Sequence, residues 1–447
     1  MTQGLAIPTQ RWQRVAGIEL LGLVSGSGLN RSTYLVRRAD GQVVQLSELL
    51  HRIVEEAARP LASGELARRV SARFGKELDV EGLTLLAEGK LEPLGLLERP
   101  ESAAAPPAPT ATPLLALRAK ATIVPKRGVE RLSRLLRPLY APPIVVVACL
   151  ALVALDVRIF VASNAGAALG DVLMTPAMLL GLFVLMSVGA LVHEVGHATA
   201  CRYGGATPGV IGVGLYVVFP AFFTDVTDSY RLSRAGRIRT DLGGLYFHLW
   251  WVLAMGLVYL ATDSPLLLLL VIMTQLQMAQ QLPPAIRLDG YFVLADLAGV
   301  PDLFARVGPV LRSLVPGRPA DPRVSELRPV SRLIVTCWVL VVVPFLAGVT
   351  VWLAISLPYI LTTAFEAVLA HARHLALALA TGQPIDAVLS LLAIGMLALP
   401  AIGSVLMLSQ ALGTIVRAII RRLTPRLPNP LPRHIAPRPK LRIGRHG

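Results

Sequence analysis

Charge and cysteine are both scarce in this sequence. Charged residues make up 16% of its 447 positions and hydrophobic residues 54%, so too little charge remains to cover several soluble domains. The three cysteines lie far apart, at Cys149, Cys201 and Cys337, which excludes a disulfide framework and a cysteine-rich zinc cluster. The apolar patch at 15–24 is interrupted by Glu19 and followed by no cleavage pattern, so no secretory signal peptide is predicted.

Acidic residues are scarcer than basic ones, at 28 against 43, which leaves a net charge of +15. The excess lies in two basic segments. Residues 114–142 contain seven basic residues and one acid, and residues 413–447 contain nine basic residues and no acid. The remaining chain is balanced, so no nucleic-acid partner is predicted. We expect the two basic segments to face the cytoplasm and to attract anionic lipids.

Long apolar runs occupy most of the chain after residue 142. A membrane-spanning helix needs about 20 apolar residues, and six runs are candidates. They lie at 143–162, 175–200, 241–262, 265–286, 333–356 and 388–412. We therefore predict an α-helical polytopic membrane protein of about six spans, with a membrane domain at 143–412.

The connections between these runs alternate in charge. Residues 163–174 contain no lysine or arginine, whereas 228–240 and 287–332 contain several arginines. By the positive-inside rule, both termini of this multi-pass protein then lie on the cytoplasmic side of the cell membrane. The stretch 357–385 falls on the outer side, either as an amphipathic surface helix or as an extension of its neighbours.

Residues 1–100 have the composition of a soluble domain. The segment 34–46 predicts two short strands around an Asp40–Gly41 turn. Three helical patterns follow, each beginning near a side chain that can cap a helix: Ser47, Ser63 and Asp79. This order predicts a small winged-helix-like α+β domain. Its 13 basic and 12 acidic residues offer no basic face for phosphates, which favours a peptide or protein partner over DNA.

Three further segments stand apart from these units. Residues 101–142 start as a Pro/Ala linker and end as a basic juxtamembrane segment, and 413–447 predicts a basic, Pro/Arg-rich cytoplasmic tail. Residues 209–223 are apolar but short, rich in glycine and broken by Pro220. Non-helical backbone at membrane depth needs cover from protein or a wet cavity, so we expect a β-like or re-entrant hairpin there.

The sequence His193-Glu194-Val-Gly-His197 ends the second apolar run. On a helix, two histidines four positions apart project from one face, so both imidazoles can reach one metal ion, while Glu194 can face a metal-bound water. The plain alternative is a set of polar residues at a helix end near the membrane interface. Ionisable groups inside a membrane are costly and usually functional, which favours the metal site.

A catalytic zinc ion usually has three protein ligands, so a third must come from elsewhere. Asp289, at the far end of the fourth run, lies on the same side of the membrane as His193 and His197 in the six-span topology. It is the preferred third ligand. Asp225 and Asp228 are nearer to the histidines in the sequence and remain alternatives.

The HEVGH sequence at the end of an apolar helix, with Leu-Asp-Gly at 288–290, resembles the site-2 protease family of intramembrane zinc metalloproteases. The segments 219–230 and 288–297 look like its bacterial peptide zinc metalloprotease branch. Members of that branch often carry a small N-terminal module similar to the peptide-binding PqqD-like winged helix, which agrees with 1–100. The resemblance covers 30–300.

The resemblance implies roles for individual residues. His193, His197 and Asp289 would bind zinc, and Glu194 would be the catalytic base. Where the family usually has asparagine, this chain has Gln281 before Leu-Asp-Gly and His248 after a Gly-Gly pair, and both are candidate contacts to the substrate backbone or an oxyanion. His248 is equally a candidate core histidine or a support for a ligand.

The resemblance implies a zinc metalloendopeptidase that hydrolyses a peptide bond in a membrane-associated protein or peptide, with a zinc-activated water and Glu194 as general base. A second hypothesis is a non-proteolytic zinc-binding membrane component of a peptide export or efflux assembly, whose N-terminal domain recruits a partner. A third, a membrane-tethered transcription regulator, is disfavoured by the neutral first domain. Because a binding-only protein has no chemical need for Glu194, the enzyme is the preferred hypothesis.

Overall fold

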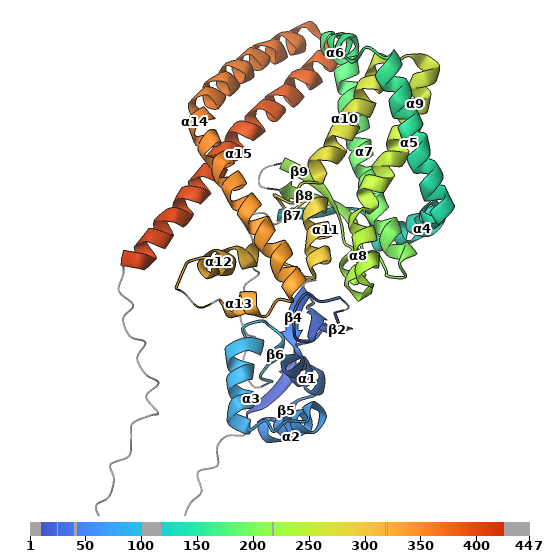
Figure 1. The fold of residues 1–447 in the computed structure, drawn as a ribbon. Helices are drawn as coiled ribbons and strands as arrows, with labels where there is room; N and C mark the ends of the chain where they lie inside the picture. Colours follow the sequence, from blue (N-terminus) through green and yellow to red (C-terminus); the bar gives the residue numbers. More distant parts are fainter. Residues whose placement is uncertain are drawn as a thin grey trace, which may run out of the picture.

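The computed structural model describes residues 10–24, 26–39, 43–100, 118–216, 219–317, 319 and 321–423. A small N-terminal domain lies at one end of a bundle of long helices, and a three-stranded sheet and several short helices lie between them (Figure 1). The Asp40–Gly41 turn, the Pro/Ala tract at 101–113 and residues 424–447 of the predicted tail lie outside the described residues.

The N-terminal domain, residues 10–100, combines short strands with three α-helices. Two antiparallel sheets have the strand orders β5-β1-β6 and β2-β3-β4. A single core lies between sheets and helices, with Trp12, Ile53, Leu66 and Leu83 fully buried. The elements are β1 (Arg11–Arg14), β2 (Glu19–Leu23), β3 (Thr33–Arg37), β4 (Val43–Ser47), α1 (Glu48–Glu56), β5 (Leu61–Ala62), α2 (Ser63–Phe74), α3 (Val80–Leu86), the π-helical turn η1 (Ala87–Leu91) and β6 (Leu97–Glu98).

The secondary structure predicted for this domain is confirmed. Strands β3 and β4 pair as the predicted hairpin, and the three helices begin within one residue of the predicted positions. Asp79 caps α3 by accepting a hydrogen bond from the Gly82 amide at 2.9 Å. The side chain of Ser47 makes no such bond, so only part of the predicted capping chemistry is used.

The loop 26–30 joins the N-terminal domain to the rest of the molecule. The Gly28 amide donates to the Gly299 carbonyl at 2.8 Å, and the Arg328 amide donates to the Gly28 carbonyl at 2.8 Å. A Cβ on Gly28 would lie 2.1 Å from the Ala298 carbonyl oxygen, so this close backbone approach requires glycine. The N-terminal domain is therefore docked against the C-terminal end of helix α11 (Asp289–Ala298).

Five helices in the described residues are long and apolar enough to cross a membrane. They are α5 (Pro142–Ala162), α7 (Pro176–Tyr203), α9 (Gly243–Thr262), α14 (Pro329–Thr381) and α15 (Pro384–Leu423). Helices α5, α7 and α9 lie together, and α14 and α15 form a second pair beside them (Figure 1). Many of their large apolar side chains are exposed, as lipid contact requires.

The structure refines the prediction of about six spans in two places. The fourth run, 265–286, forms the shorter apolar helix α10, which ends at Gln281 after 17 residues. At about 26 Å, α10 is at the lower limit of the length needed to cross a membrane. The stretch 357–385 is no surface helix, because α14 continues without a break to Thr381. It is the extension of its neighbours that the sequence left open.

A third sheet covers one end of the bundle. Strands β8 (Ile211–Tyr216) and β9 (Phe219–Thr224) form the hairpin expected at 209–223, and β7 (Arg118–Val124) pairs with the other side of β8. Helix α4 (Lys126–Leu136) follows β7 and packs on α7 through Val129. The sequence placed 118–136 in the connection before the membrane domain, whereas the structure makes both elements part of that domain.

Short elements gather at the two ends of the bundle (Figure 1). Helix α6 (Ala165–Met174) lies at one end, near the turn between α14 and α15. The sheet and α11 lie at the other end, where a core forms around Tyr291, Leu303 and Trp338. The elements at that end also include η2 (Arg137–Tyr140), η3 (Thr227–Arg231), α8 (Arg234–Asp241), α12 (Phe304–Ser313) and α13 (Pro322–Ser325).

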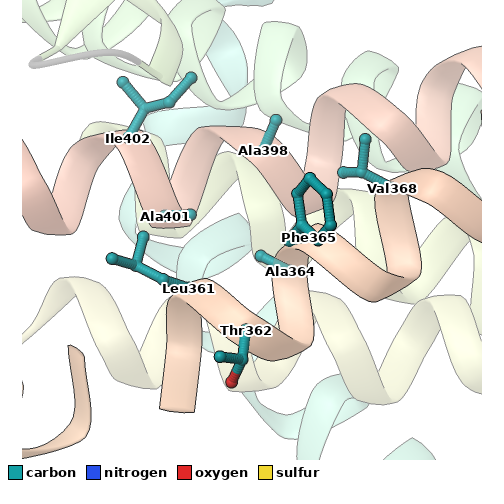
Figure 2. Close-up of a pocket in the computed structure, with 8 residues that line it drawn as sticks. All are labelled: Leu361, Thr362, Ala364, Phe365, Val368, Ala398, Ala401 and Ile402. Atoms are coloured by element: carbon teal, nitrogen blue, oxygen red, sulfur yellow. The ribbon is translucent and has the colours of Figure 1, made fainter. Parts of the chain in front are cut away.

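An apolar groove of about 510 Å³ lies between α14 and α15. Figure 2 shows Phe365 of α14 beside Ala398 of α15, with apolar side chains around them. The hydroxyl of Thr362, its polar lining group, is bonded to the Pro358 carbonyl of its own helix at 3.1 Å. The groove therefore offers no free polar group and belongs to the apolar surface of the two helices.

Candidate metal centre

Helix α7 supplies two of the three candidate ligands. His193 and His197 lie one turn apart, shortly before the helix ends at Tyr203. Their Nε2 atoms are 3.0 Å apart, as two histidines at positions i and i+4 of one helix allow. His193 is 5% exposed, so the pair faces the protein interior and not solvent.

Asp289 supplies the third candidate ligand from the first turn of α11. Its carboxylate oxygens lie 3.3 Å from His193 Nε2 and 3.5 Å from His197 Nε2. A Cβ on the next residue, Gly290, would lie 1.8 Å from the Leu282 carbonyl oxygen, so glycine is needed where the chain brings Asp289 to the histidines. The three side chains form a buried group that could hold a metal ion.

The outward-facing ring nitrogens of both histidines are also engaged. His197 Nδ1 lies 2.8 Å from the Thr240 carbonyl, which can only accept, so Nδ1 carries the proton and Nε2 presents a lone pair in the neutral ring. His193 Nδ1 lies 3.3 Å from Nδ1 of the fully buried His248. Such contacts fix the orientation of ligand rings.

Glycine brings α7 and α9 into contact beside the histidines. A Cβ on Gly196 would lie 2.2 Å from the Gly243 carbonyl oxygen, and one on Gly244 would lie 2.2 Å from Cε1 of His193. The hydroxyl of Tyr140 donates a hydrogen bond to the Gly196 carbonyl at 3.1 Å, at the point where α7 and α9 are in contact. The His193 ring therefore packs directly on the backbone of α9.

Glu194 contacts the β8–β9 hairpin. It is 9% exposed, and its Oε2 accepts a hydrogen bond from the hydroxyl of Thr224 at 2.7 Å. The same hydroxyl lies 2.9 Å from the Glu194 carbonyl oxygen. Since Thr224 is the last residue of β9, the candidate base is attached to the end of that strand.

The two alternative acidic ligands point elsewhere. Asp225 accepts from the Thr227 hydroxyl at 2.6 Å and pairs with Arg37 of the N-terminal domain at 3.4 Å. Asp228 pairs with Arg231 at 2.8 Å. Within the part of the chain that the structure describes, neither belongs to the group that could hold a metal ion, so the structure favours Asp289 over these alternatives.

The two residues at the family's asparagine positions occupy different places. His248 lies behind His193, on the side away from Asp289. Gln281 ends α10, and its backbone carbonyl oxygen would lie 3.0 Å from a Cβ on Gly290. The buried Oε1 of Gln281 has no hydrogen-bond partner among the described residues. Nε2 of the buried His248 likewise has no hydrogen-bond partner among the described residues, so each of the two residues carries one unpaired polar atom.

A pair of carboxyl groups lies beside α11 outside the spans. The buried Arg237 donates from Nε to Asp296 at 2.7 Å. Burial, together with the charge of Asp296, raises the pKa of Asp241. The environment of Asp241 therefore disfavours its charged form.

Several residues that contact the candidate site were not predicted from the sequence. Thr240 acts through its backbone carbonyl, which any residue type possesses. Thr224 lies in the segment 219–230 and ends an apolar hairpin, so a polar residue at that position was a usable signal. Tyr140 directly precedes the first span, and only the packing of η2 on α7 brings it to Gly196.

Comparison of the chain with protein-family models, curated proteins and solved structures found no match. The resemblance to site-2 proteases therefore rests on the motifs and their geometry.

Proposed function

We propose that His193, His197 and Asp289 bind a zinc ion. Ligand atoms about 2.0–2.1 Å from a tetrahedral zinc are about 3.3 Å from one another, and the three observed separations are 3.0, 3.3 and 3.5 Å. The geometry of His197 also supports this, since its Nε2 carries a lone pair towards the other two groups. Without a bound cation, these acceptors would be buried close together with no group to compensate them, which costs folding free energy.

We further propose that the protein is an intramembrane zinc metalloprotease that hydrolyses a peptide bond in a membrane-associated protein or peptide. A bound zinc ion supplies Lewis acidity, which makes water more acidic and polarises a peptide carbonyl. Glu194 accepts a proton from water and delivers it to the leaving amide nitrogen. The observation that carries this proposal is a buried glutamate, Glu194, directly after His193 on the helix that supplies two of the three converging candidate ligands, in a chain with helices that can cross a membrane.

The β8–β9 hairpin supports an extended substrate. In the described residues β9 is an edge strand of its sheet, and its last residue, Thr224, touches Glu194. A substrate segment unwound from a helix could add to this edge and present its backbone to the base. The free Oε1 of Gln281 would accept a hydrogen bond from a substrate amide.

Charge supports an orientation with both termini in the cytoplasm of the cell. The exposed basic residues of α4 lie beside the start of α5, at the same end of the bundle as α8 and α11 (Figure 1). They are Lys126, Arg127, Arg131 and Arg134. Such a surface attracts anionic headgroups, and the N-terminal domain on that side is available to a peptide or protein partner.

The alternative is a non-proteolytic zinc-binding component of a peptide export or efflux assembly. Its ligands would be the same, but its activity would not need Glu194. The hydrogen bond from Thr224 to Glu194 favours the enzyme, because a carboxylate kept beside the ligands without binding the metal suits a general base.

Metal analysis tests the first proposal. Purified wild-type protein is expected to hold about one zinc ion per chain, and His193→Ala to lose it. His374→Ala is the matched control, because His374 is an exposed histidine on α14 and its loss leaves the zinc content unchanged. Equal zinc in His193→Ala and wild type would contradict the proposed ligand set.

A comparison of membrane peptides tests the second proposal. Cells that carry wild type or Glu194→Gln are compared by mass spectrometry of the membrane fraction. Glu194→Gln is expected to keep its zinc and to accumulate an uncleaved peptide, which purified wild-type protein then cuts. If Glu194→Gln cuts that peptide as fast as wild type, the protein is no protease of this kind and the export component becomes the better hypothesis.

A further inference from the structure

Thr224 makes two contacts with Glu194. Its hydroxyl lies 2.7 Å from Oε2 of the carboxylate and 2.9 Å from the backbone carbonyl of the same residue. The side chain of Glu194 is therefore drawn back towards its own helix by one group from another element. A glutamate has several rotatable bonds, and a contact of this kind selects one of its conformations.

The backbone around Thr224 is itself firmly held. Thr224 is paired with the fully buried Ile211 of β8. After it, the Asp225 amide donates to the Val210 carbonyl at 2.9 Å, and the Gly209 amide donates to the Asp225 carbonyl at 2.7 Å. Backbone hydrogen bonds on both sides of the hairpin place the hydroxyl, so its position does not depend on the metal ligands.

The chemistry of a hydroxyl suits this position. A threonine hydroxyl donates one proton and also accepts, so it can keep a contact with a carboxylate and with a carboxylic acid. A lysine or arginine in its place would pair strongly with the carboxylate and compete with water for it. Thr224 holds Glu194 without neutralising it.

We propose that Thr224 is the positioning residue of the catalytic base. This inference rests on the proposed protease function and deepens it. Thr224 orients the carboxylate of Glu194, and because it ends β9 it keeps the base in register with the edge strand along which substrate is proposed to lie. Substrate placement and base placement then share one rigid element.

The test compares Thr224→Val, which keeps the shape and removes the hydroxyl, with Thr224→Ser, which keeps the hydroxyl. The probe is a set of internally quenched peptides built on an apolar membrane-spanning segment, cleaved by full-length protein in nanodiscs. We expect Thr224→Val to lower kcat by about 10- to 100-fold, a part of what general-base catalysis contributes. KM and zinc content are expected to stay near wild type, and Thr224→Ser is expected to restore kcat to within about threefold.

A matched control is Thr199→Val. Thr199 is fully buried on α7, and its hydroxyl bonds to the Val195 carbonyl of its own helix at 2.7 Å, so its loss should leave kcat unchanged. The inference is overturned if Thr224→Val keeps wild-type kcat, if Thr224→Ser is as slow as Thr224→Val, or if Thr224→Val loses its zinc. If wild type and Glu194→Gln cut every peptide at the same rate, the proposed function fails, and the base that Thr224 would position fails with it.

Discussion

The N-terminal domain and the candidate metal centre each bury a histidine, and the two histidines differ in the hydrogen-bond partners of their ring nitrogens. His51 and His193 are both 5% exposed. Neither ring nitrogen of His51 has a hydrogen-bond partner among the described residues, and its ring lies on Tyr34 with centroids 4.5 Å apart. His193 instead has a partner at each nitrogen. Burial alone therefore does not distinguish the two histidines, whereas the convergence of His193 with His197 and Asp289 does.

The electrostatics of His51 support its structural role. Burial lowers the pKa of His51 below 6.5, although the nearby Glu55 acts in the opposite direction. His51 is therefore neutral in the folded domain and behaves as a flat apolar ring. The metal centre, by contrast, gathers two imidazoles and two carboxylates within one buried region.

The largest expected effect comes from Gly244→Ala, which changes the packing of His193 in the candidate metal centre and leaves His51 untouched. The new Cβ would lie 2.2 Å from Cε1 of His193, so the ring must leave its position. We expect zinc affinity to fall by at least about 100-fold, the upper range for lost support of a ligand. Gly348→Ala on α14 is the control, because no atom lies within 4 Å of its Cβ. Equal affinity in a competition titration of both variants would refute the close-packing argument.

Gly28→Ala separates the two regions without touching either histidine. Its Cβ would lie 2.1 Å from the Ala298 carbonyl oxygen, so docking of the loop should weaken by about 1–3 kcal/mol. We expect faster hydrogen exchange at 26–30 and an unchanged zinc content. Gly64→Ala serves as the control, since its nearest neighbouring atom is 4.0 Å away. Loss of zinc in Gly28→Ala would mean that the metal centre depends on the N-terminal domain.

The next effect is a pH dependence confined to the N-terminal domain. The unfolded chain protonates His51 near pH 6.5, and the folded domain does so only at lower pH. The stability contribution is therefore present above pH 6.5 and lost as the pH falls below it. Hydrogen exchange of α1, corrected for intrinsic rates, should reveal this loss in wild type. His51→Phe should remove it, and a pH response that persists in His51→Phe would assign the effect to another group.

The smallest effect is expected for Arg37→Ala. Its contact with Asp225 is 3.4 Å long and about 30% exposed on both sides, and such surface pairs contribute about 0–1 kcal/mol. Thermal unfolding should change little, and added salt should reduce even that difference. A loss comparable to that of Gly28→Ala would show that the charge pair, and not the glycine contact, holds the domain in place.

Part of this site could be predicted because helix geometry depends only on residues close together in the sequence. A helix places His193 and His197 on one face whatever surrounds it, and the six-run topology led us to expect Asp289 near them. The β3–β4 hairpin and the three helices of the N-terminal domain followed from turn residues and periodic leucines in the same way, whereas β1, β2, β5 and β6 were not predicted. Their relation to the PqqD-like fold remains a prediction.

Other features could not be predicted because they depend on which elements meet. The contact of Thr224 with Glu194 joins a strand to a helix, and the contact of His193 with His248 joins two helices. The length of α14 was left undecided by the sequence, and Pro344 and Pro358 lie inside the helix, although a proline usually predicts a break.

By itself the sequence determined the candidate ligand types, the helix that carries two of them and the long apolar helices, because residue chemistry and helical periodicity act over a few positions. Only the tertiary structure decided that Asp289, and not Asp225 or Asp228, lies beside the two histidines, what contacts the other nitrogen of each imidazole and which group contacts Glu194. Those contacts join residues far apart in the chain, and their distances depend on the packing of α7, α9, α11 and β9 against one another.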